Sequence, residues 1–349
     1  MKNTEAVFIG RSAADMTNIS DGSVGLVVTS PPYPMIEMWD DIFSRQNENI
    51  TGALNSDPLR AFELMHSELD KVWKEVTRVL IPGGIACINI GDATRTIKGT
   101  FQLFDNHSRI SNSFKILGLQ NLPSILWRKQ TNAPNKFMGS GMLPPGAYVT
   151  LEHEYILIFR KGNKRNFSST EEKLNRKKSA FFREERNLWF SDIWFDIKGV
   201  KQDTDIESLR PRTAAFSFEL AYRLIQMFSV KFDIVLDPFV GTGTTLLAAL
   251  AGQRNSIGYD IENKLSKVIT TNTINSVGII NSFISNRIKN HNEFIALREQ
   301  EKGKMKYFNS YHQCSVMTRQ EVDIEIVVIE KCIVEKDDIF VTTYSIRIS

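Results

Sequence analysis

The sequence predicts an α/β fold built around a parallel sheet, and two segments carry this prediction. Residues 59–80 place apolar side chains three and four positions apart, which indicates an amphipathic helix. Pro82-Gly83-Gly84 ends that helix, and IACINI at residues 85–90 follows as a strand. Residues 232–262 read as strand, glycine loop, helix and strand. Units of this kind build parallel sheets that are covered by helices.

The size and composition of the chain are those of a soluble globular protein. Its 349 residues are enough for one large α/β domain with additions, or for two domains. Hydrophobic residues make up 42% and charged residues 24%, which is ordinary for this class. The net charge of +3 is too small to indicate a nucleic-acid partner by itself. No apolar run approaches the roughly 18–20 residues of a membrane span, so no membrane partner is expected.

The N-terminus and the cysteines predict where the protein resides. The first ten residues, MKNTEAVFIG, lack a signal-peptide pattern. Cys87, Cys314 and Cys332 are odd in number and widely spaced, which argues against a disulfide framework. A cytoplasmic, reducing location is therefore expected.

The second predicted strand, residues 24–29, ends abruptly in a proline-rich elbow. Residues 6–9 form the first strand, and the elbow reads Ser30-Pro31-Pro32-Tyr33-Pro34. Proline lacks a backbone N–H and fixes φ, so three prolines in four positions cannot continue a central strand. Pro-Pro-Tyr also occurs as an extended ligand motif in disordered segments. The strand-forming run that precedes it here argues against that interpretation.

A basic segment follows the strand at residues 148–160, and we expect it to be an insertion, partly loop. Lysine and arginine crowd the chain from Arg160 to Arg186, with aromatic residues interleaved. Such a run is most often a solvated surface, but it is also a candidate for contact with nucleic acid. Residues 303–349 differ again, because polar and apolar residues alternate there, which predicts a small β-rich appendage.

The glycine loop lies directly after a strand and opens an apolar helix. It reads DPFVGTGTT, from Asp237 to Thr245. Glycines at such a turn allow the backbone to approach a ligand closely. Asp260 ends the next strand, where an acidic side chain can bind ribose hydroxyls. The unit is predicted to bind an adenosine-containing cofactor, and a strand–turn–helix without a ligand is the alternative.

The residues of the loop favour one cofactor over two others. The loop has no lysine, which a phosphate-binding P-loop requires, and Leu246 stands where a dinucleotide fingerprint has its third glycine. Asp237 can pair with an ammonium group, and the ring of Phe239 can attract a cation. S-adenosylmethionine carries an ammonium group, a ribose and a sulfonium but no phosphate, so it is the predicted cofactor.

Two motifs together resemble those of the amino-methyltransferases of DNA. TSPPY at residues 29–33 is similar to the catalytic motif of that family, and DPFVGTGTT is similar to the motif that opens its S-adenosylmethionine site. The catalytic motif comes first, which resembles the circularly rearranged beta group. The resemblance runs from residue 6 to residue 262 and includes RVLIPGGIACINIGD, LWRKQTNAPN, HEYILIFRK and TAAFSFEL. Arg11 is a departure, because many relatives have aspartate after Gly10.

The resemblance implies a Rossmann-like methyltransferase fold with a mixed, mostly parallel seven-stranded sheet. Residues 1–160 would form the catalytic half and residues 210–302 the cofactor-binding half. Within the catalytic elbow Ser30-Pro31-Pro32-Tyr33, it implies hydrogen-bond acceptors at Ser30 Oγ and the Pro31 carbonyl. Tyr33 would stack on a base. The implied cofactor-binding residues are Asp237, Pro238, Phe239, Gly241, Gly243, Thr244, Asp260 and Phe216.

This arrangement suits methyl transfer to an exocyclic amine. Such an amine is a poor nucleophile because its lone pair is delocalised into the ring. Acceptors aimed at the NH₂ group localise the lone pair and align it with the methyl–sulfonium bond. Ring-carbon methylation would need a Pro-Cys pair, which the sequence lacks. The five histidines are scattered, so no metal site is expected.

The first letter of the catalytic motif favours one target base. Serine at this position, Ser30, is typical of cytosine-N4 enzymes in this family, whereas aspartate is commoner among adenine-N6 enzymes. We therefore expect a site-specific enzyme that methylates a flipped cytosine in double-stranded DNA and is paired with a restriction endonuclease. Adenine N6, an RNA base and a cofactor-binding module without catalysis stay open as alternatives.

The remaining expectations concern recognition, assembly and location. Residues 161–209 are the candidate target-recognition region, because lysine and arginine there could contact phosphates and guanine edges. The appendage at residues 303–349 could share that role or form a homodimer. The resemblance places the protein in a prokaryotic cytoplasm, in association with the nucleoid.

Overall fold

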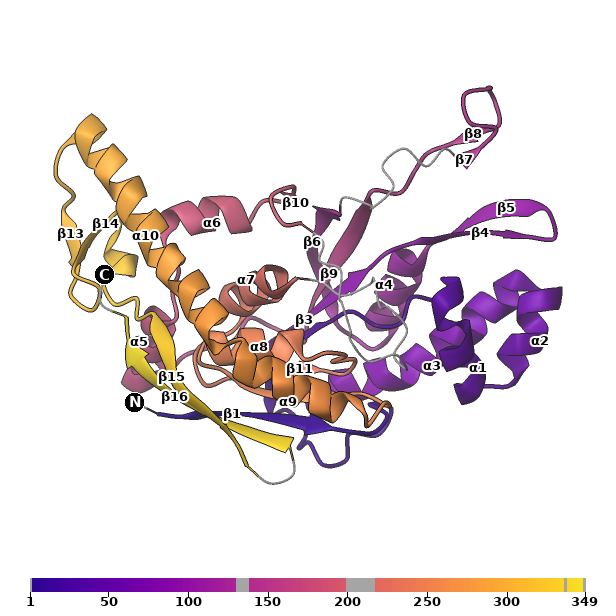
Figure 1. Cartoon of the computed structure of the whole chain (residues 1–349), viewed down its shortest axis with the longest axis horizontal. Helices are drawn as coiled ribbons and strands as arrows, with labels where there is room; N and C mark the ends of the chain where they lie inside the picture. Colours follow the sequence, from indigo (N-terminus) through magenta and orange to yellow (C-terminus); the bar gives the residue numbers. More distant parts are fainter. Residues whose placement is uncertain (1, 130–137, 199–216, 336–337, 348–349) are drawn as a thin grey trace.

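The structure is a computed structural model that describes residues 2–129, 138–198, 217–335 and 338–347. Its centre is a ten-stranded sheet with helices on both faces (Figure 1). Across the sheet the strands are β10 (Ile193–Trp194), β6 (Gln120–Arg128), β9 (His153–Arg160), β3 (Leu80–Ile90), β2 (Val24–Thr29), β11 (Ile234–Asp237), β12 (Asn255–Tyr259), β1 (Thr4–Ile9), β16 (Ile339–Ile346) and β15 (Val327–Val334).

The seven central strands form the mixed, mostly parallel sheet that the resemblance implied. The five strands from β3 to β1 run parallel, and β9 is antiparallel to both β3 and β6. The predicted fold class is therefore confirmed. The sheet is wider than the predicted seven strands, because β10 extends it on one side and β16 and β15 extend it on the other.

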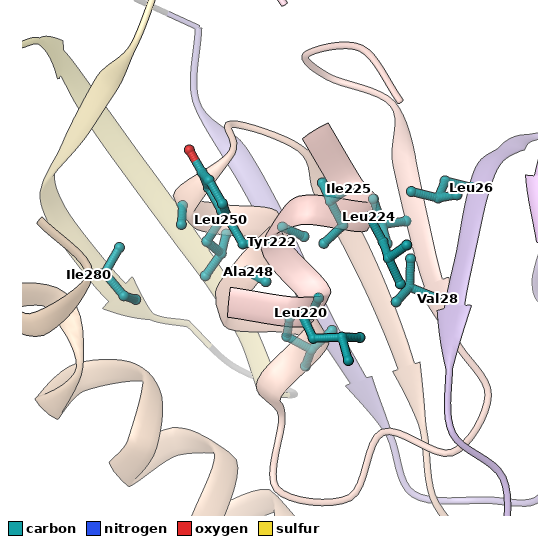
Figure 2. Close-up of a cluster of buried hydrophobic side chains, with 14 of the residues drawn as sticks. Leu26, Val28, Leu220, Tyr222, Leu224, Ile225, Ala248, Leu250 and Ile280 are labelled. Atoms are coloured by element: carbon teal, nitrogen blue, oxygen red, sulfur yellow. The ribbon is translucent and has the colours of Figure 1, made fainter. Parts of the chain in front are cut away.

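Two layers of helices cover the sheet, and successive side chains along a strand point to one layer and then to the other. In β2, Leu26 and Val28 belong to one buried cluster and Val27 to the other. Figure 2 shows the first cluster, in which α7 packs on β2 and α8 packs beside α7, over β1, β11 and β12. The helices of this layer are α7 (Phe218–Phe228), α8 (Thr244–Ala251), α9 (Leu265–Asn275) and α10 (Val277–Lys302). Those of the other layer are α1 (Asp40–Gln46), α2 (Asn49–Ser56), α3 (Pro58–Val79) and α4 (Asn106–Ile116).

Helix α3 begins and ends close to where the sequence predicts. Asp57 caps its first turn by accepting a hydrogen bond from the Arg60 backbone N–H, and Pro58 occupies the first helical position. The helix ends at Val79, and β3 follows directly. The Pro82-Gly83-Gly84 turn lies inside β3, where the pairing with β2 shifts between Leu80 and Ile85.

The C-terminal residues are β-rich, as expected, but two of their four described strands belong to the main sheet. β13 (Tyr307–Asn309) and β14 (Cys314–Val316) form a separate pair. β16 pairs with β1 and carries β15 beside it, so β1 is not an exposed edge strand. The hydroxyl groups of Thr4 and Tyr344 join β1 to β16 by a hydrogen bond.

Two hairpins project from the end of the sheet where the parallel strands finish, which we call its carboxyl end (Figure 1). One is β4 (Ala93–Ile97) with β5 (Thr100–Phe104), directly after β3. The other is β7 (Met138–Gly139) with β8 (Ala147–Tyr148), between β6 and β9. The rings of Phe101 and Tyr148 stack with their centroids 4.3 Å apart, which joins the two hairpins.

The first part of the basic insertion lies at the opposite end, the amino end of the sheet. The Gly83 N–H, at the start of β3, donates to the Lys161 carbonyl at 2.7 Å. The Arg165 guanidinium pairs at 2.6 Å with Asp233, which directly precedes β11. Helices α5 (Thr170–Lys178) and α6 (Arg183–Trp189) follow. The chain returns toward the carboxyl end only at β10, which pairs with Leu126 and Trp127 near the end of β6.

The order of the strands reverses between β2 and β11. From β2 the sheet continues to β3 on one side, and from β11 it continues to β12 on the other. Ligands of open α/β sheets bind outside the carboxyl ends of the strands at such a switch point. The elbow and the glycine loop both begin there. Of the described helices, none combines the length and apolar character needed to cross a membrane.

Candidate functional site

A cleft of about 570 Å³, counted with the open space at its mouth, lies at this switch point. Its walls come from both motifs and from the ends of β1 and β12. The lining residues are Arg11, Ser12, Ala13, Ser30, Pro32, Trp39, Ile42, Gln46, Pro238, Phe239, Asp260 and Ile261. The tertiary structure therefore brings the elbow and the glycine loop, some 200 positions apart in the sequence, to one site.

The glycine loop needs its glycines at two positions. Gly241 and Gly243 have φ of 53° and 89°, a left-handed conformation that other residues rarely adopt. A Cβ at Gly243 would also lie 3.2 Å from Ile269. α8 then begins at Thr244. The loop backbone is held against β12, because the Gly241 N–H donates to Asp260 Oδ2 at 3.2 Å.

Asp260 lies where the sequence predicts, at the end of β12 and in the wall of the cleft. Its other carboxylate oxygen, Oδ1, accepts from the Glu262 N–H at 3.0 Å. The Asp260 N–H donates to the Ile9 carbonyl of β1 at 3.2 Å. These bonds fix the side chain at the mouth of two neighbouring parallel strands.

Asp237 has a different environment from the one expected for a residue that binds an ammonium group. Its side chain is 2% exposed, and its carboxylate accepts three hydrogen bonds from the protein. Thr29 donates to Oδ1 at 2.5 Å, Thr245 to Oδ2 at 2.5 Å, and the Phe239 N–H to Oδ1 at 3.0 Å. Burial raises its pKa to about 6, against the opposing effect of these donors. Asp237 therefore connects β2 to the glycine loop and leaves little surface for a ligand.

The elbow places its residues at different depths. Ser30 and Pro32 line the cleft, while Pro31 and Tyr33 are buried. Tyr33 is 6% exposed, and a Cβ at Gly91 would lie 3.1 Å from its ring. Its ring thus offers little free face in this structure, so the expected stacking on a base stays a prediction.

Three residues that the sequence analysis did not single out surround the Tyr33 hydroxyl. Tyr33 donates to Glu154 Oε2 at 2.9 Å. Asn89 Nδ2 lies 2.9 Å from the Tyr33 hydroxyl and 2.7 Å from Glu154 Oε2. Lys129 Nζ pairs with the other oxygen of Glu154 at 2.8 Å. We call these four residues, with Ser30, the elbow network.

A signal for these residues was present in the sequence. Asn89, Lys129 and Glu154 lie in the blocks INIGD, LWRKQ and HEYIL, which the resemblance included without a role. Asn89 is near the end of β3, Lys129 directly follows β6, and Glu154 is near the start of β9. Because β9 runs antiparallel, its first residues meet the last residues of β3 and β6. Only the pairing of the strands shows this convergence.

The predicted cofactor-binding residues are only partly gathered at the cleft. Pro238, Phe239 and Asp260 line it, whereas Gly241, Gly243 and Thr244 shape the loop without lining it. Phe216 lies outside the described residues. Arg11, to which the sequence analysis gave no role, contributes a cation to the lining.

Comparison with known proteins gives a family for this arrangement. The model of the DNA methylase family N6_N4_Mtase matches residues 24–271. The type II methyltransferase M.MthZI of Methanothermobacter thermautotrophicus is 51% identical over 328 residues, which cover 93% of this chain and 91% of the relative. The type II methyltransferase M.MjaI of Methanocaldococcus jannaschii is 53% identical over 269 residues, 74% of this chain and 87% of the relative.

Solved structures agree with the fold. A putative DNA modification methylase from Thermus thermophilus, in complex with S-adenosyl-L-methionine, has a TM-score of 0.60 and 33% identity. The match covers 78% of this chain and 95% of that one. The PvuII DNA methyltransferase, described as cytosine-N4-specific, has a TM-score of 0.50 at 15% identity over 76% of this chain and 86% of that one, which supports the fold alone. The chain therefore belongs to the N6/N4 DNA methylase family.

Proposed function

We propose that this protein transfers a methyl group from S-adenosyl-L-methionine to the exocyclic N4 amine of a cytosine in a specific DNA sequence. One observation carries the proposal: the catalytic elbow and the cofactor loop line the same cleft at the switch point of the sheet. Donor and acceptor of a methyl group must meet within one site, since alignment supplies much of the rate. A module that only bound DNA would not need the two motifs together.

The lining of the cleft fits the cofactor. Asp260 at the end of β12 would bind the ribose hydroxyls. Trp39, Ile42, Phe239 and Ile261 supply apolar surface for a planar adenine ring. Arg11 would pair with the carboxylate of the methionine part. When bound, the cofactor supplies an electrophilic methyl group on a sulfonium.

The elbow then provides the acceptor side of the reaction. Ser30 lines the cleft and is held rigidly, because Pro31 and Pro32 fix the backbone that follows it. Its oxygen and the Pro31 carbonyl would accept hydrogen bonds from the two N–H groups of the target amine. This localises the lone pair of the amine, which would form the new N–C bond as the methyl–sulfonium bond breaks and its electron pair goes to sulfur. The methylated amine would then lose one proton to water, and no covalent intermediate is needed.

The choice of cytosine rests on Ser30. Serine begins the catalytic motif here, and a neutral hydroxyl can accept a hydrogen bond from an amine. An adenine N6 amine could use the same acceptors, so adenine is the alternative target. Two relatives that are more than 50% identical, M.MthZI and M.MjaI, are described as type II methyltransferases. We infer that this enzyme likewise works beside a restriction endonuclease of the same specificity.

DNA would approach the carboxyl end of the sheet, where the cleft opens. The β4–β5 and β7–β8 hairpins project on this side (Figure 1). Residues 161–182, part of the region expected to recognise the target, lie at the other end of the sheet. We therefore restrict the proposed recognition surface to the two hairpins and β10.

The test is expression in a host without DNA methylation, followed by digestion of the genomic DNA to nucleosides and mass spectrometry. N4-methyldeoxycytidine, located by sequencing in one short motif, is the expected product. Detection of N6-methyldeoxyadenosine instead would support methyl transfer but would show that the target base is adenine. Neither product, from a protein that still binds S-adenosyl-L-methionine in titration calorimetry, would overturn the proposal in favour of a module without catalysis.

A further inference from the structure

We propose that Glu154 is a positioning residue: acting through Tyr33, it orients the Ser30 hydroxyl so that the Ser30 lone pairs face the cleft. The inference rests on the proposed function, because it concerns how Ser30 meets the target amine. It assigns a role to a buried acidic residue that lies outside both motifs.

The elbow network forms a chain of hydrogen bonds that leads away from the cleft. Ser30 Oγ lies 3.1 Å from the Tyr33 hydroxyl oxygen, and Tyr33 donates to Glu154 Oε2 at 2.9 Å. Lys129 holds the other oxygen of Glu154 at 2.8 Å. Asn89, Tyr33 and Glu154 are 1%, 6% and 8% exposed, so water does not compete for these contacts.

The orientation of the Asn89 amide is set by the same neighbours. Its Nδ2 lies 2.7 Å from Glu154 Oε2, 2.9 Å from the Tyr33 oxygen and 3.5 Å from Ser30 Oγ. The reversed amide would place its oxygen against the carboxylate oxygen. Asn89 therefore donates within the network and supplies no acceptor to Ser30 or Tyr33.

Counting protons fixes the direction of the remaining bond. The Glu154 carboxylate only accepts, so the single proton of the Tyr33 hydroxyl is used on Glu154. Burial, and then the charge of Glu154, raise the pKa of Tyr33 well above its ordinary value, so this proton stays in place at neutral pH. In the Ser30–Tyr33 contact the donor must then be Ser30.

The consequence is an acceptor at the cleft. With its proton directed to Tyr33, the Ser30 oxygen presents lone pairs elsewhere, which is what an amine N–H requires. An unrestrained serine could instead point its proton at the amine and lose this bond. Glu154 thus makes a hydroxyl, which can donate or accept, act as an acceptor. The series of hydrogen bonds from Ser30 to Glu154 also polarises the Ser30 oxygen, because hydrogen bonds in series strengthen one another.

The first test compares Tyr33→Phe, Glu154→Gln and Glu152→Gln in methyl transfer to DNA. Tyr33→Phe keeps the ring and removes only the hydroxyl. We expect kcat to fall by roughly 10- to 100-fold, with the KM for DNA and the Kd for S-adenosyl-L-methionine within about twofold of wild type. Glu154→Gln should likewise lower kcat and leave the KM for DNA and the Kd for S-adenosyl-L-methionine unchanged. Glu152, two positions earlier in an exposed pair with Arg128, is the matched control, and its variant should keep the wild-type kcat. Wild-type kcat in Tyr33→Phe would overturn the inference.

The second test does not depend on activity. Protein labelled with ¹³C at tyrosine Cζ gives a Tyr33 resonance, identified by its loss in Tyr33→Phe. This resonance should shift in Glu154→Gln and stay in place in Glu152→Gln. An unchanged resonance in a folded Glu154→Gln variant would refute the contact even if DNA is methylated. If the wild-type protein methylates no DNA, the proposed function fails, and the resonance still decides whether the network exists.

Discussion

The two ends of the sheet use polar residues in opposite ways. At the carboxyl end, Ser30 and Asp260 line an open cleft, and hydrogen bonds connect Ser30 to the buried residues of the elbow network. At the amino end, several cations of the basic insertion pair with acidic residues. Arg165 pairs with Asp233, and Lys177 pairs with Asp323 at 3.3 Å. This dense run of charge thus lies at the end without the cleft.

The amino end shows what such charges do instead. Lys178 and Lys231 share the carboxylate of Glu325, at 2.7 and 2.9 Å. The Lys231 side chain is only 5% exposed, so its charge depends on this partner. The pairs fasten the insertion to the sheet and to the C-terminal residues. The direction of the parallel strands therefore locates the site, whereas the local density of charge does not.

The largest expected effect is at the carboxyl end, in Ser30→Ala. Loss of one acceptor for the target amine should lower kcat by about 10²- to 10³-fold. The Kd for S-adenosyl-L-methionine should stay within about twofold, because the proposed contacts to the cofactor come from Asp260, Phe239 and Arg11. Steady-state kinetics and titration calorimetry measure the two quantities. An equal loss of both would mean that Ser30 shapes the cleft as a whole.

Glu325→Gln should have the reverse pattern at the amino end. It leaves Lys231 buried without its carboxylate, which should lower the free energy of unfolding by about 3 kcal/mol. The kcat of the folded variant should not change, because Glu325 lies far from the cleft along the strands. Urea denaturation measures the free energy of unfolding, and an activity assay at low temperature measures the kcat of the folded variant. Normal stability with reduced kcat would break the division between the two ends.

Asp237 should make the stability of the folded protein depend on pH. Its folded-state pKa of about 6 lies above the ordinary value of 3.8, so ionisation is less favourable in the folded state. The free energy of unfolding should therefore be highest with respect to this group below pH 4 and decline as pH rises through 6, by about 3 kcal/mol. Asp237→Asn should remove this decline. Denaturant titrations at several pH values would show it, and parallel curves for both proteins would contradict it.

The smallest expected effect distinguishes the two ends in DNA binding. Lys98, exposed at the turn of the β4–β5 hairpin, should contribute about one phosphate contact. Lys98→Ala should then lower the slope of log affinity against log salt by about one. Lys173→Ala, on α5 at the amino end, is the matched control and should leave the slope unchanged. The opposite result would return recognition to the basic insertion.

Local motifs could be predicted well because their residues are adjacent in the chain. The strand at residues 24–29, the glycine loop and the acid after β12 all have the predicted structure. Glu154 could not be assigned a role in this way, because the sequence block HEYIL that contains it does not show which residues it meets. Its position depends on an antiparallel strand between two parallel ones. Asp237 was found by its motif, but its burial, and hence its role as a tie between loops, depends on Thr29 in another strand.

The α/β class, the two motifs and the cofactor that suits them follow from local sequence patterns, because proline, glycine and the hydrophobic period act over a few residues. Which residues meet depends instead on the tertiary structure. Strand order places Ser30 beside the cofactor loop, strand direction brings Glu154 to Tyr33, and the path of the insertion takes its cations to the far end of the sheet. Contacts of this kind join distant residues through the sheet, so no local pattern in the chain specifies them.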